Sequence, residues 1–201
     1  MLEFDAENHI YRLDGVIVPS VSEVLRFASR ELYGSTSVQA LEIAADRGTR
    51  VHAATEALDR NGTADIDPDI EPYVRAYAQF LKDNKVRWAK IEEHVAGYDY
   101  KGSPEYAGTL DRLGFVNDVP TLMDVKTTRT ITARHKRLYA AQMTAYCNAI
   151  SPQFEPQLMI LQLKNNGGYE PMIVDREIDI WNGCLTLHKA FAARKRGKKN
   201  G

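Results

Sequence analysis

The chain has little cysteine and no long apolar run. Only Cys147 and Cys184 occur among 201 residues, too few for a disulfide framework, a four-cysteine zinc site or a four-cysteine iron–sulfur cluster. No stretch approaches the roughly 20 apolar residues that cross a bilayer. The opening Met-Leu-Glu-Phe-Asp-Ala-Glu lacks the basic start and apolar run of a signal peptide. We therefore expect a cytoplasmic protein with no membrane contact and with two buried thiols.

Length and composition indicate one folded domain. The chain is 44% hydrophobic and 26% charged, close to the averages of globular proteins, and is too short to suggest two domains without a linker. The net charge of −1 hides an asymmetry, since residues 1–125 carry 13 basic and 22 acidic side chains and residues 126–201 carry 13 and 5. The basic excess of the second segment suits a surface that binds a polyanion.

Hydrophobic patterning predicts an α/β protein. The dipeptide Asp14-Gly15 between alternating apolar residues predicts a hairpin over 10–18, and Ser20 with Glu23 has the spacing of a helix capping box. Further along, the apolar period is first helical and then becomes that of strands. Helices are predicted over 20–34, 38–58, 69–87, 136–150 and 178–193, and strands over 91–95, 106–116, 121–127, 158–163 and 169–174.

These elements divide one domain, residues 1–201, into three parts. The first is an N-terminal hairpin with helices over 1–90, and the second is a sheet with helices over 91–193. The third is a basic tail over 194–201, which we expect to be frayed.

Three charged residues of the predicted sheet form a candidate active centre. Asp124 and Lys126 are two apart on a strand and so project from one face. Pairing across the preceding turn would bring the carboxylate of Asp111 beside that of Asp124. Two converging carboxylates repel each other unless a cation or a proton lies between them, and hard oxygen ligands suit Mg²⁺ or Mn²⁺. An Asp-x-Lys strand taken alone is more often a solvated surface pair, so the rest of the chain decides its meaning.

Four short blocks, in order along the chain, resemble the PD-(D/E)XK nuclease superfamily. They are Gly48-Thr49-Arg50-Val51-His52, Gly108-Thr109-Leu110-Asp111, Asp124-Val125-Lys126 and Gln142-Met143-Thr144-Ala145-Tyr146. Their order and spacing, from about residue 20 to 175, are similar to the RecB-like exonuclease branch, which includes the mitochondrial genome maintenance exonuclease and phage RecB-like nucleases. Leu110 stands where the proline of the superfamily's name would be. The resemblance implies a restriction-endonuclease-like core, a mixed central sheet flanked by helices.

The resemblance also implies a role for each block. His52, Asp111, Asp124 and the carbonyl of Val125 would hold Mg²⁺ or Mn²⁺, and an imidazole ligand favours Mn²⁺. Lys126 would serve the attacking water, so that Asp111, Asp124 and Lys126 form the catalytic set. Relatives with an iron–sulfur cluster use four cysteines, and this cofactor is therefore not expected here.

Other polar residues are candidates for binding the substrate. Gln142 and Tyr146 are four apart and share one helical face, which would point at the nucleic-acid backbone or at the catalytic lysine. Arg129, Arg134 and Lys136 lie in the basic segment after the Asp-x-Lys strand and would engage phosphates of the substrate strand.

Two glutamates are accessory candidates. Glu56 follows His52 by one helical turn and would touch the metal through water or hold the imidazole. Glu93 precedes Asp111 by one strand; its neighbour Glu92 is also acidic, and because side chains alternate along a strand only one of the two can face inward. We assign the inward position to Glu93.

Together these features predict a metal-dependent deoxyribonuclease. The expected activity is exonucleolytic hydrolysis of phosphodiester bonds from single-stranded DNA ends, in phage or bacterial replication or recombination. The sequence has no P-loop motif, so a helicase or recombination partner would be another chain. Two alternatives stay open: a structure-specific endonuclease on the same fold, and a non-catalytic nucleic-acid-binding recombination partner.

Overall fold

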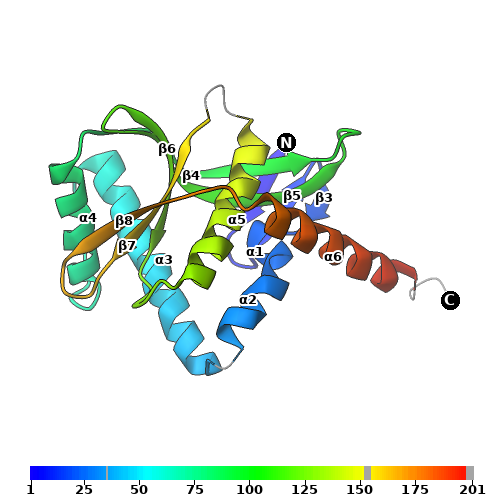
Figure 1. Ribbon diagram of the computed structural model, residues 1–201, viewed down its shortest axis with the longest axis horizontal. Coiled ribbons are helices and arrows are strands. Elements are labelled where there is room, and N and C mark those ends of the chain that lie inside the picture. The colour runs from blue at the N-terminus through cyan, green and yellow to red at the C-terminus, as the bar shows by residue number, and fades with distance from the viewer. Residues whose placement is uncertain (35, 152–154, 198–201) are drawn as a thin grey trace.

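A computed structural model of the chain describes residues 1–34, 36–151 and 155–197 (Figure 1). Its centre is a five-stranded mixed sheet in the order β4-β5-β6-β7-β8, and the N-terminus forms a separate three-stranded sheet in the order β1-β2-β3. The predicted α/β class, with a mixed central sheet flanked by helices, is confirmed. Residues 198–201 of the predicted basic tail lie outside the described residues.

The N-terminal sheet is built around the predicted hairpin. Asp14 and Gly15 both have positive φ, 51° and 78°, as the tight turn between two antiparallel strands requires. Ser20 caps the first helix, because its hydroxyl accepts a hydrogen bond of 3.0 Å from the Glu23 N–H. The elements of this region are β1 (Leu2–Asp5), β2 (Ile10–Leu13), β3 (Val16–Val18), α1 (Val21–Val24) and α2 (Arg26–Tyr33).

Two longer helices follow, α3 (Val38–Asn61) and α4 (Glu71–Asp83). The prediction that the second of these helices reaches residue 87 is wrong. Asn84 leaves the helical conformation, and its side-chain amide donates a hydrogen bond of 2.9 Å to the carbonyl of Phe80. Val86 then begins the sheet, where pairing with Val116 outweighs any helical tendency. The sheet therefore starts about five residues before the predicted boundary at residue 90.

The central sheet contains one parallel contact. Strands β6 and β7 run parallel and are connected by helix α5, whereas the other neighbouring strands are antiparallel. A parallel pair requires such a crossover connection. The elements are β4 (Val86–Tyr98), β5 (Pro104–Val116), β6 (Val119–Lys126), α5 (Ala133–Ile150), β7 (Gln157–Leu163), β8 (Tyr169–Val174) and α6 (Ile178–Gly197).

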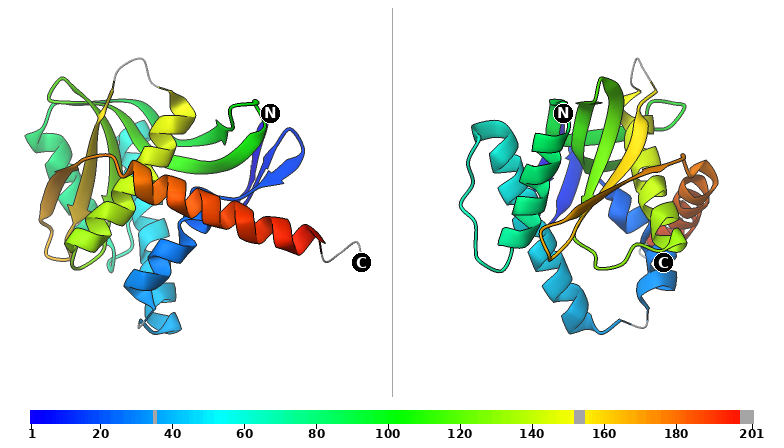
Figure 2. Two further views of the ribbon diagram at one scale, coloured as in Figure 1. Left: turned by 45° about the vertical axis from the view of Figure 1, so that its right-hand side comes forward. Right: turned by 60° about the vertical axis from the view of Figure 1, so that its left-hand side comes forward.

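Helices cover both faces of this sheet, α3 and α4 on one side and α5 and α6 on the other (Figure 2). Successive side chains of β6 point to opposite faces of the sheet. Leu122 packs on the α5 side, and Met123 and Val125 pack on the α3 side. The same alternation directs Asp124 and Lys126 toward α5, at the end of β6 that extends past its last pair with β5.

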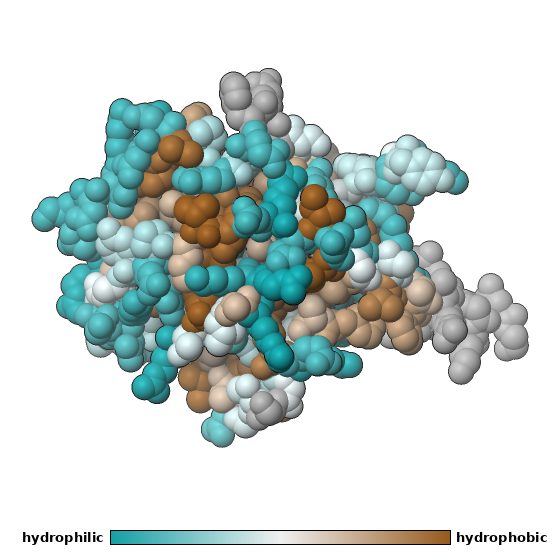
Figure 3. Space-filling view, in the orientation of Figure 1, coloured by the Kyte–Doolittle hydropathy of each residue, from teal (hydrophilic) through white to brown (hydrophobic). Residues whose placement is uncertain are grey.

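The surface carries scattered hydrophobic residues. On the face seen in Figure 3, hydrophobic patches are separated by hydrophilic side chains. Among the described residues, none of the helices combines the length and the apolar character needed to span a bilayer.

Candidate active site

Three side chains from three different elements converge at one point. His52 comes from α3, Glu92 from β4 and Asp111 from β5, and one potential ligand atom of each lies within 4.8 Å of the others. A histidine and two carboxylates at this spacing are a donor set that divalent ions accept. The structure thus brings together two of the predicted ligands, His52 and Asp111, with a residue that the sequence analysis did not choose.

The imidazole of His52 is held from both sides. Nδ1 lies 3.2 Å from Oε1 of Glu92 and 3.7 Å from Oδ2 of Asp111, and Nε2 lies 3.1 Å from the carbonyl oxygen of Val125. Burial by itself lowers the pKa of His52, but the carboxylates of Asp111 and Glu92 outweigh burial and raise this pKa to about 9. Both ring nitrogens face acceptors, so in the absence of an ion the imidazole is protonated and donates from both.

Asp111 joins this cluster to strand β6. Its Oδ2 accepts a hydrogen bond of 2.7 Å from the Val125 N–H, beyond the last regular pairs of β5 with β6. Since the Val125 carbonyl faces His52, one residue of β6 contacts two of the predicted ligands through its backbone. The predicted convergence of Asp111 with the Asp-x-Lys strand is therefore present.

Lys126 is fixed against Asp124 and helix α5. Its Nζ donates a 2.8 Å hydrogen bond to Oδ1 of Asp124 and a 3.4 Å contact to Oε1 of Gln142, and it lies 4.8 Å from the centre of the Tyr139 ring. The Gln142 amide in turn donates to the hydroxyl of Tyr146 at 2.9 Å. Gln142 thus contacts the lysine directly and Tyr146 contacts Gln142, so the two residues share one face of α5 at the site, as their spacing predicts.

Electrostatics couple the two charged residues of β6. Burial raises the pKa of Asp124 to about 6, with Asp111 adding to the rise and Lys126 opposing it. Burial lowers the pKa of Lys126, but Asp124 and Asp111 outweigh it and hold the pKa above its usual value. The ammonium form of Lys126 is accordingly the stable form while Asp124 is ionised beside it.

Glu92 occupies the position that the sequence analysis gave to Glu93, and that assignment is wrong. Glu93 pairs with Lys90 at 2.8 Å and is half exposed. On β4, the residues before and after Glu92 pair with the two residues that flank Asp111 on β5. Glu92 therefore lies opposite Asp111 in the sheet. Its φ of 46° is unusual for a non-glycine residue and marks local strain, which at such a site is a functional sign.

A fully buried arginine holds Glu92 in this conformation. Arg112 has no exposed side-chain surface, and its Nη1 donates hydrogen bonds of 2.8 Å to Oε1 of Glu92 and to the carbonyl of Asp111. Its Nε donates to Oδ2 of Asp59 at 2.6 Å, and Nη2 to the hydroxyl of Thr55 at 3.2 Å. The sequence offers only a weak signal for this role, namely an arginine directly after Asp111 in a strand that is mostly buried.

The residues present fit a divalent ion. Nδ1 of His52 lies 3.2 Å from Oε1 of Glu92 and 3.7 Å from Oδ2 of Asp111, near the ~3.0 Å that separates adjacent ligands of an octahedral ion bound at about 2.1 Å. Asp124 is buried and pairs with the Lys126 ammonium, whose Nζ lies 2.8 Å from Oδ1 and 2.7 Å from Oδ2, so its carboxylate can add to this donor set.

The cluster opens into a cavity of about 1060 Å³. Its floor is made by the cluster and by the end of β6, and one wall by the α3 face that carries Gly48 and Thr49. Glu56 also lines this cavity, but its carboxylate pairs with Arg60 at 2.8 Å. It therefore does not hold His52 directly, and a contact through water stays a prediction.

The three predicted basic contacts lie outside this cavity. Arg129 lines a separate hollow of about 230 Å³ that begins at Thr127. Arg134 is exposed at the start of α5, and Lys136 is partly buried one turn into it. The structure thus brings one of them, Arg129, next to the end of β6.

Comparisons with known proteins give only distant similarities. No family model matches the chain, and no curated protein matches it. A solved structure of SSO0001 is 12% identical over 85% of this chain and 75% of that chain, with a TM-score of 0.48. Two structures of LHK-Exo, an alkaline exonuclease from Laribacter hongkongensis, are also similar. The complex with dAMP is 15% identical over 76% and 92% of the two chains, with a TM-score of 0.39, and the second structure is 16% identical over 85% and 92%, with a TM-score of 0.36.

Proposed function

We propose that this chain is a metal-dependent deoxyribonuclease of the PD-(D/E)XK type that hydrolyses phosphodiester bonds. The observation that carries the proposal is the convergence of His52, Glu92 and Asp111 beside the Asp124–Lys126 pair, at the floor of one cavity. A surface ion pair needs none of these partners, and a simple binding module has no use for an ammonium held against buried carboxylates.

The ligands of a Mg²⁺ or Mn²⁺ ion would be His52, Asp111, Asp124 and the Val125 carbonyl, with Glu92 added to the predicted set. When bound, such an ion supplies Lewis-acid stabilisation of charge on the phosphate and activates water. The choice between the two ions is part of the proposal, and the imidazole favours Mn²⁺.

The residues around the ion site would orient the reactants. Lys126, held by Asp124 and Gln142, would donate a hydrogen bond to the attacking water and offset the negative charge of the phosphate. A new bond would form between the water oxygen and phosphorus as the ester bond to the leaving oxygen breaks; the proton of the water would pass to solvent, and the leaving oxygen would take up a proton from solvent. Arg112 would hold Glu92 beside Asp111 during the reaction, because it donates hydrogen bonds to both the Glu92 carboxylate and the Asp111 carbonyl.

The finer parts of the proposal follow from the sequence resemblance. We propose the RecB-like branch as the family, single-stranded ends as the substrate, and replication or recombination in a phage or bacterial cytoplasm as the setting. A helicase or recombination protein on another chain would be the partner. We further propose that all of residues 1–201 act as one nuclease domain.

The test uses linear single-stranded DNA labelled at either end, with Mn²⁺, Mg²⁺ or a chelator. We expect metal-dependent loss of label by wild type, no cleavage by Lys126→Ala, and full cleavage by Lys101→Ala, which removes an exposed lysine of the β4–β5 loop. The end that shortens first gives the polarity. Cleavage of a closed circular strand would instead identify an endonuclease, and full activity of Lys126→Ala would refute the proposed chemistry.

A further inference from the structure

A second polar hollow adjoins the candidate active site. It measures about 230 Å³ and is lined by Arg47, Tyr73, Thr127, Arg129 and Lys164, together with neighbouring residues of the β7–β8 turn. Thr127 is shared with the larger cavity of the active site, and it follows Lys126 directly in sequence. The two cavities therefore adjoin at Thr127, the residue that follows Lys126.

Arg47 is the central cation of the hollow and has no anionic partner among the described residues. One Nη of its guanidinium donates a weak 3.4 Å hydrogen bond to the carbonyl of Thr127, and the group lies 5.5 Å from the centre of the Tyr73 ring. Its Nε is buried and donates a hydrogen bond to no acceptor in the part of the chain that the structure describes. Because the Nε has almost no accessible surface, a ligand in the hollow would contact the Nη groups of the guanidinium.

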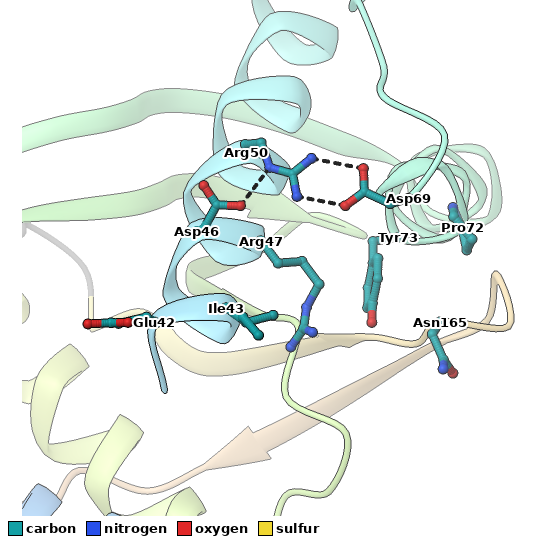
Figure 4. A pocket seen from close by; sticks show the side chains of 9 residues that line it. All are labelled: Glu42, Ile43, Asp46, Arg47, Arg50, Asp69, Pro72, Tyr73 and Asn165. Carbon is teal, nitrogen blue, oxygen red and sulfur yellow. Dashed lines mark hydrogen bonds and ion pairs between the residues drawn. The ribbon is translucent and has the colours of Figure 1, made fainter. Parts of the chain in front are cut away.

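Arg50, one turn further along α3, differs from Arg47 because carboxylates within the fold neutralise its charge. It donates to Asp46 at 3.0 Å, to Asp67 at 3.1 Å and to Asp69 at 2.6 Å. Figure 4 shows Arg50 turned toward Asp46 and Asp69, and Arg47 turned away from them, beside Tyr73. Two arginines three positions apart thus differ in that one is neutralised by carboxylates and the other is not.

The loop that carries Arg129 is pinned in place. The buried side-chain amide of Gln162 donates hydrogen bonds of 2.7 Å to the carbonyl of Thr128 and 3.1 Å to that of Arg129. The Arg129 side chain itself is exposed at the hollow. Lys164 is the third cation of the lining, but it already pairs with Glu170 at 2.7 Å. Arg47 and Arg129 are therefore the two cations available to a ligand.

The extent of the site is limited by charge. Beyond Arg47 and Tyr73 the surface opens into an outer hollow of about 620 Å³ that also carries Glu42, Asp46 and Asp69. Those carboxylates oppose a polyanion. The inner hollow, at several times the ~30 Å³ share of one water molecule in liquid water, has room for a single phosphate group.

We propose that Arg47 and Arg129 form a subsite for one non-scissile phosphate of the DNA strand, next to the phosphate that is cleaved. The inference rests on the proposed nuclease function and adds a binding contact to it. Arg47 offers its Nη groups to phosphate oxygens, its guanidinium lies 5.5 Å from the centre of the Tyr73 ring, and Arg129 supplies the second positive charge. The subsite positions the strand and takes no part in bond breaking.

The experiment measures binding of a short, dye-labelled single-stranded oligonucleotide by fluorescence anisotropy, in chelator, over a range of salt concentrations. Arg47→Gln and Arg129→Gln should each weaken binding by at least about tenfold, the loss of one charge-assisted hydrogen bond. Each should also reduce the slope of log K against log salt by about 0.7, the value for one contact to a single strand. Arg47→Lys retains the charge and should restore most of the slope.

Arg87→Gln is the matched control. It removes one arginine charge from the start of β4, where Arg87 pairs at 2.9 Å with Asp118 of the turn before β6. This is the opposite end of β6 from Thr127, about 26 Å away along an eight-residue strand. The control should keep the wild-type affinity and slope.

The outcomes separate this subsite from the proposed function. If wild type binds and cleaves while Arg47→Gln and Arg129→Gln match it in affinity and salt slope, the subsite is refuted and the nuclease stands. If wild type neither binds nor cleaves, the proposed function fails and the subsite fails with it. Should Arg47→Gln not fold, as judged by its thermal melt, Arg129→Gln decides, because that side chain is exposed.

Discussion

Arg112 and Glu92 form a 2.8 Å ion pair at the back of the candidate active site, with the arginine fully buried and the glutamate in a left-handed backbone conformation. Glu92 in turn faces His52 at 3.2 Å. The position of one donor of the metal cluster is therefore set by a side chain that does not touch the cavity. The same arginine also neutralises Asp59. Arg112 therefore contributes to the stability of the fold as well as to the position of Glu92.

Replacing Arg112 should destabilise the fold strongly. Arg112→Ala leaves Asp59 and Glu92 buried without their cation, and breaking a buried pair in this way costs about 3–5 kcal/mol. Urea unfolding followed by circular dichroism measures the loss. Arg87→Ala, which breaks an exposed pair, should cost no more than about 1 kcal/mol. Equal effects of the two substitutions would contradict the assigned role.

The two adjacent glutamates of β4 should behave differently. Glu92→Gln removes a charge that faces His52 and Asp111, and should lower the affinity for Mn²⁺ by about 10–100-fold. Glu93→Gln removes a charge that pairs only with Lys90 and should leave the affinity unchanged. Isothermal titration with Mn²⁺ measures both, and the Mn²⁺-induced rise in melting temperature provides a second readout. A larger effect of Glu93→Gln would restore the original assignment.

Gly108 of the Gly-x-x-Asp block is required by packing. A Cβ at this position would lie 2.8 Å from a ring carbon of Tyr146 and 3.1 Å from a methyl carbon of Val21, and both neighbours are buried. Gly108→Ala should therefore reduce the free energy of unfolding by about 1–3 kcal/mol. Gly183→Ala, on α6, where a Cβ meets no atom within 4 Å among the described residues, should instead stabilise by up to about 1 kcal/mol. Thermal melts of the two variants test this contrast.

Stability should fall in alkaline solution because of Cys147. Burial raises the pKa of this thiol from 9.0 to about 11, so the unfolded chain releases the proton at a lower pH than the folded chain. The contribution is fully present below pH 9 and is lost as pH rises toward 11, with a slope of up to about 1.4 kcal/mol per pH unit. Cys147→Ala should show a correspondingly shallower decline in urea unfolding between these values. An identical decline in both proteins would assign the effect to other groups.

Local chemistry explains why parts of the fold could be predicted. The Asp14-Gly15 turn and the Ser20 cap depend on neighbouring residues alone, and both occur as predicted. The same holds for Asp124 and Lys126, since a strand places residues two apart on one face. The end of α4 was misplaced because the pairing of Val86 with Val116, thirty residues away, decides it.

The sequence by itself determined the local turns and caps, the face shared by Asp124 and Lys126, and the four blocks that indicate a nuclease. Only the tertiary structure decided between Glu92 and Glu93, because a register shift between Trp88 and Lys90 and the positive φ of Glu92 interrupt the simple alternation of β4. It also decided that Arg50 rather than Arg47 binds carboxylates, since two of the three, Asp67 and Asp69, come from the segment after α3. Contacts of this kind depend on register and on distant segments, which no local pattern records.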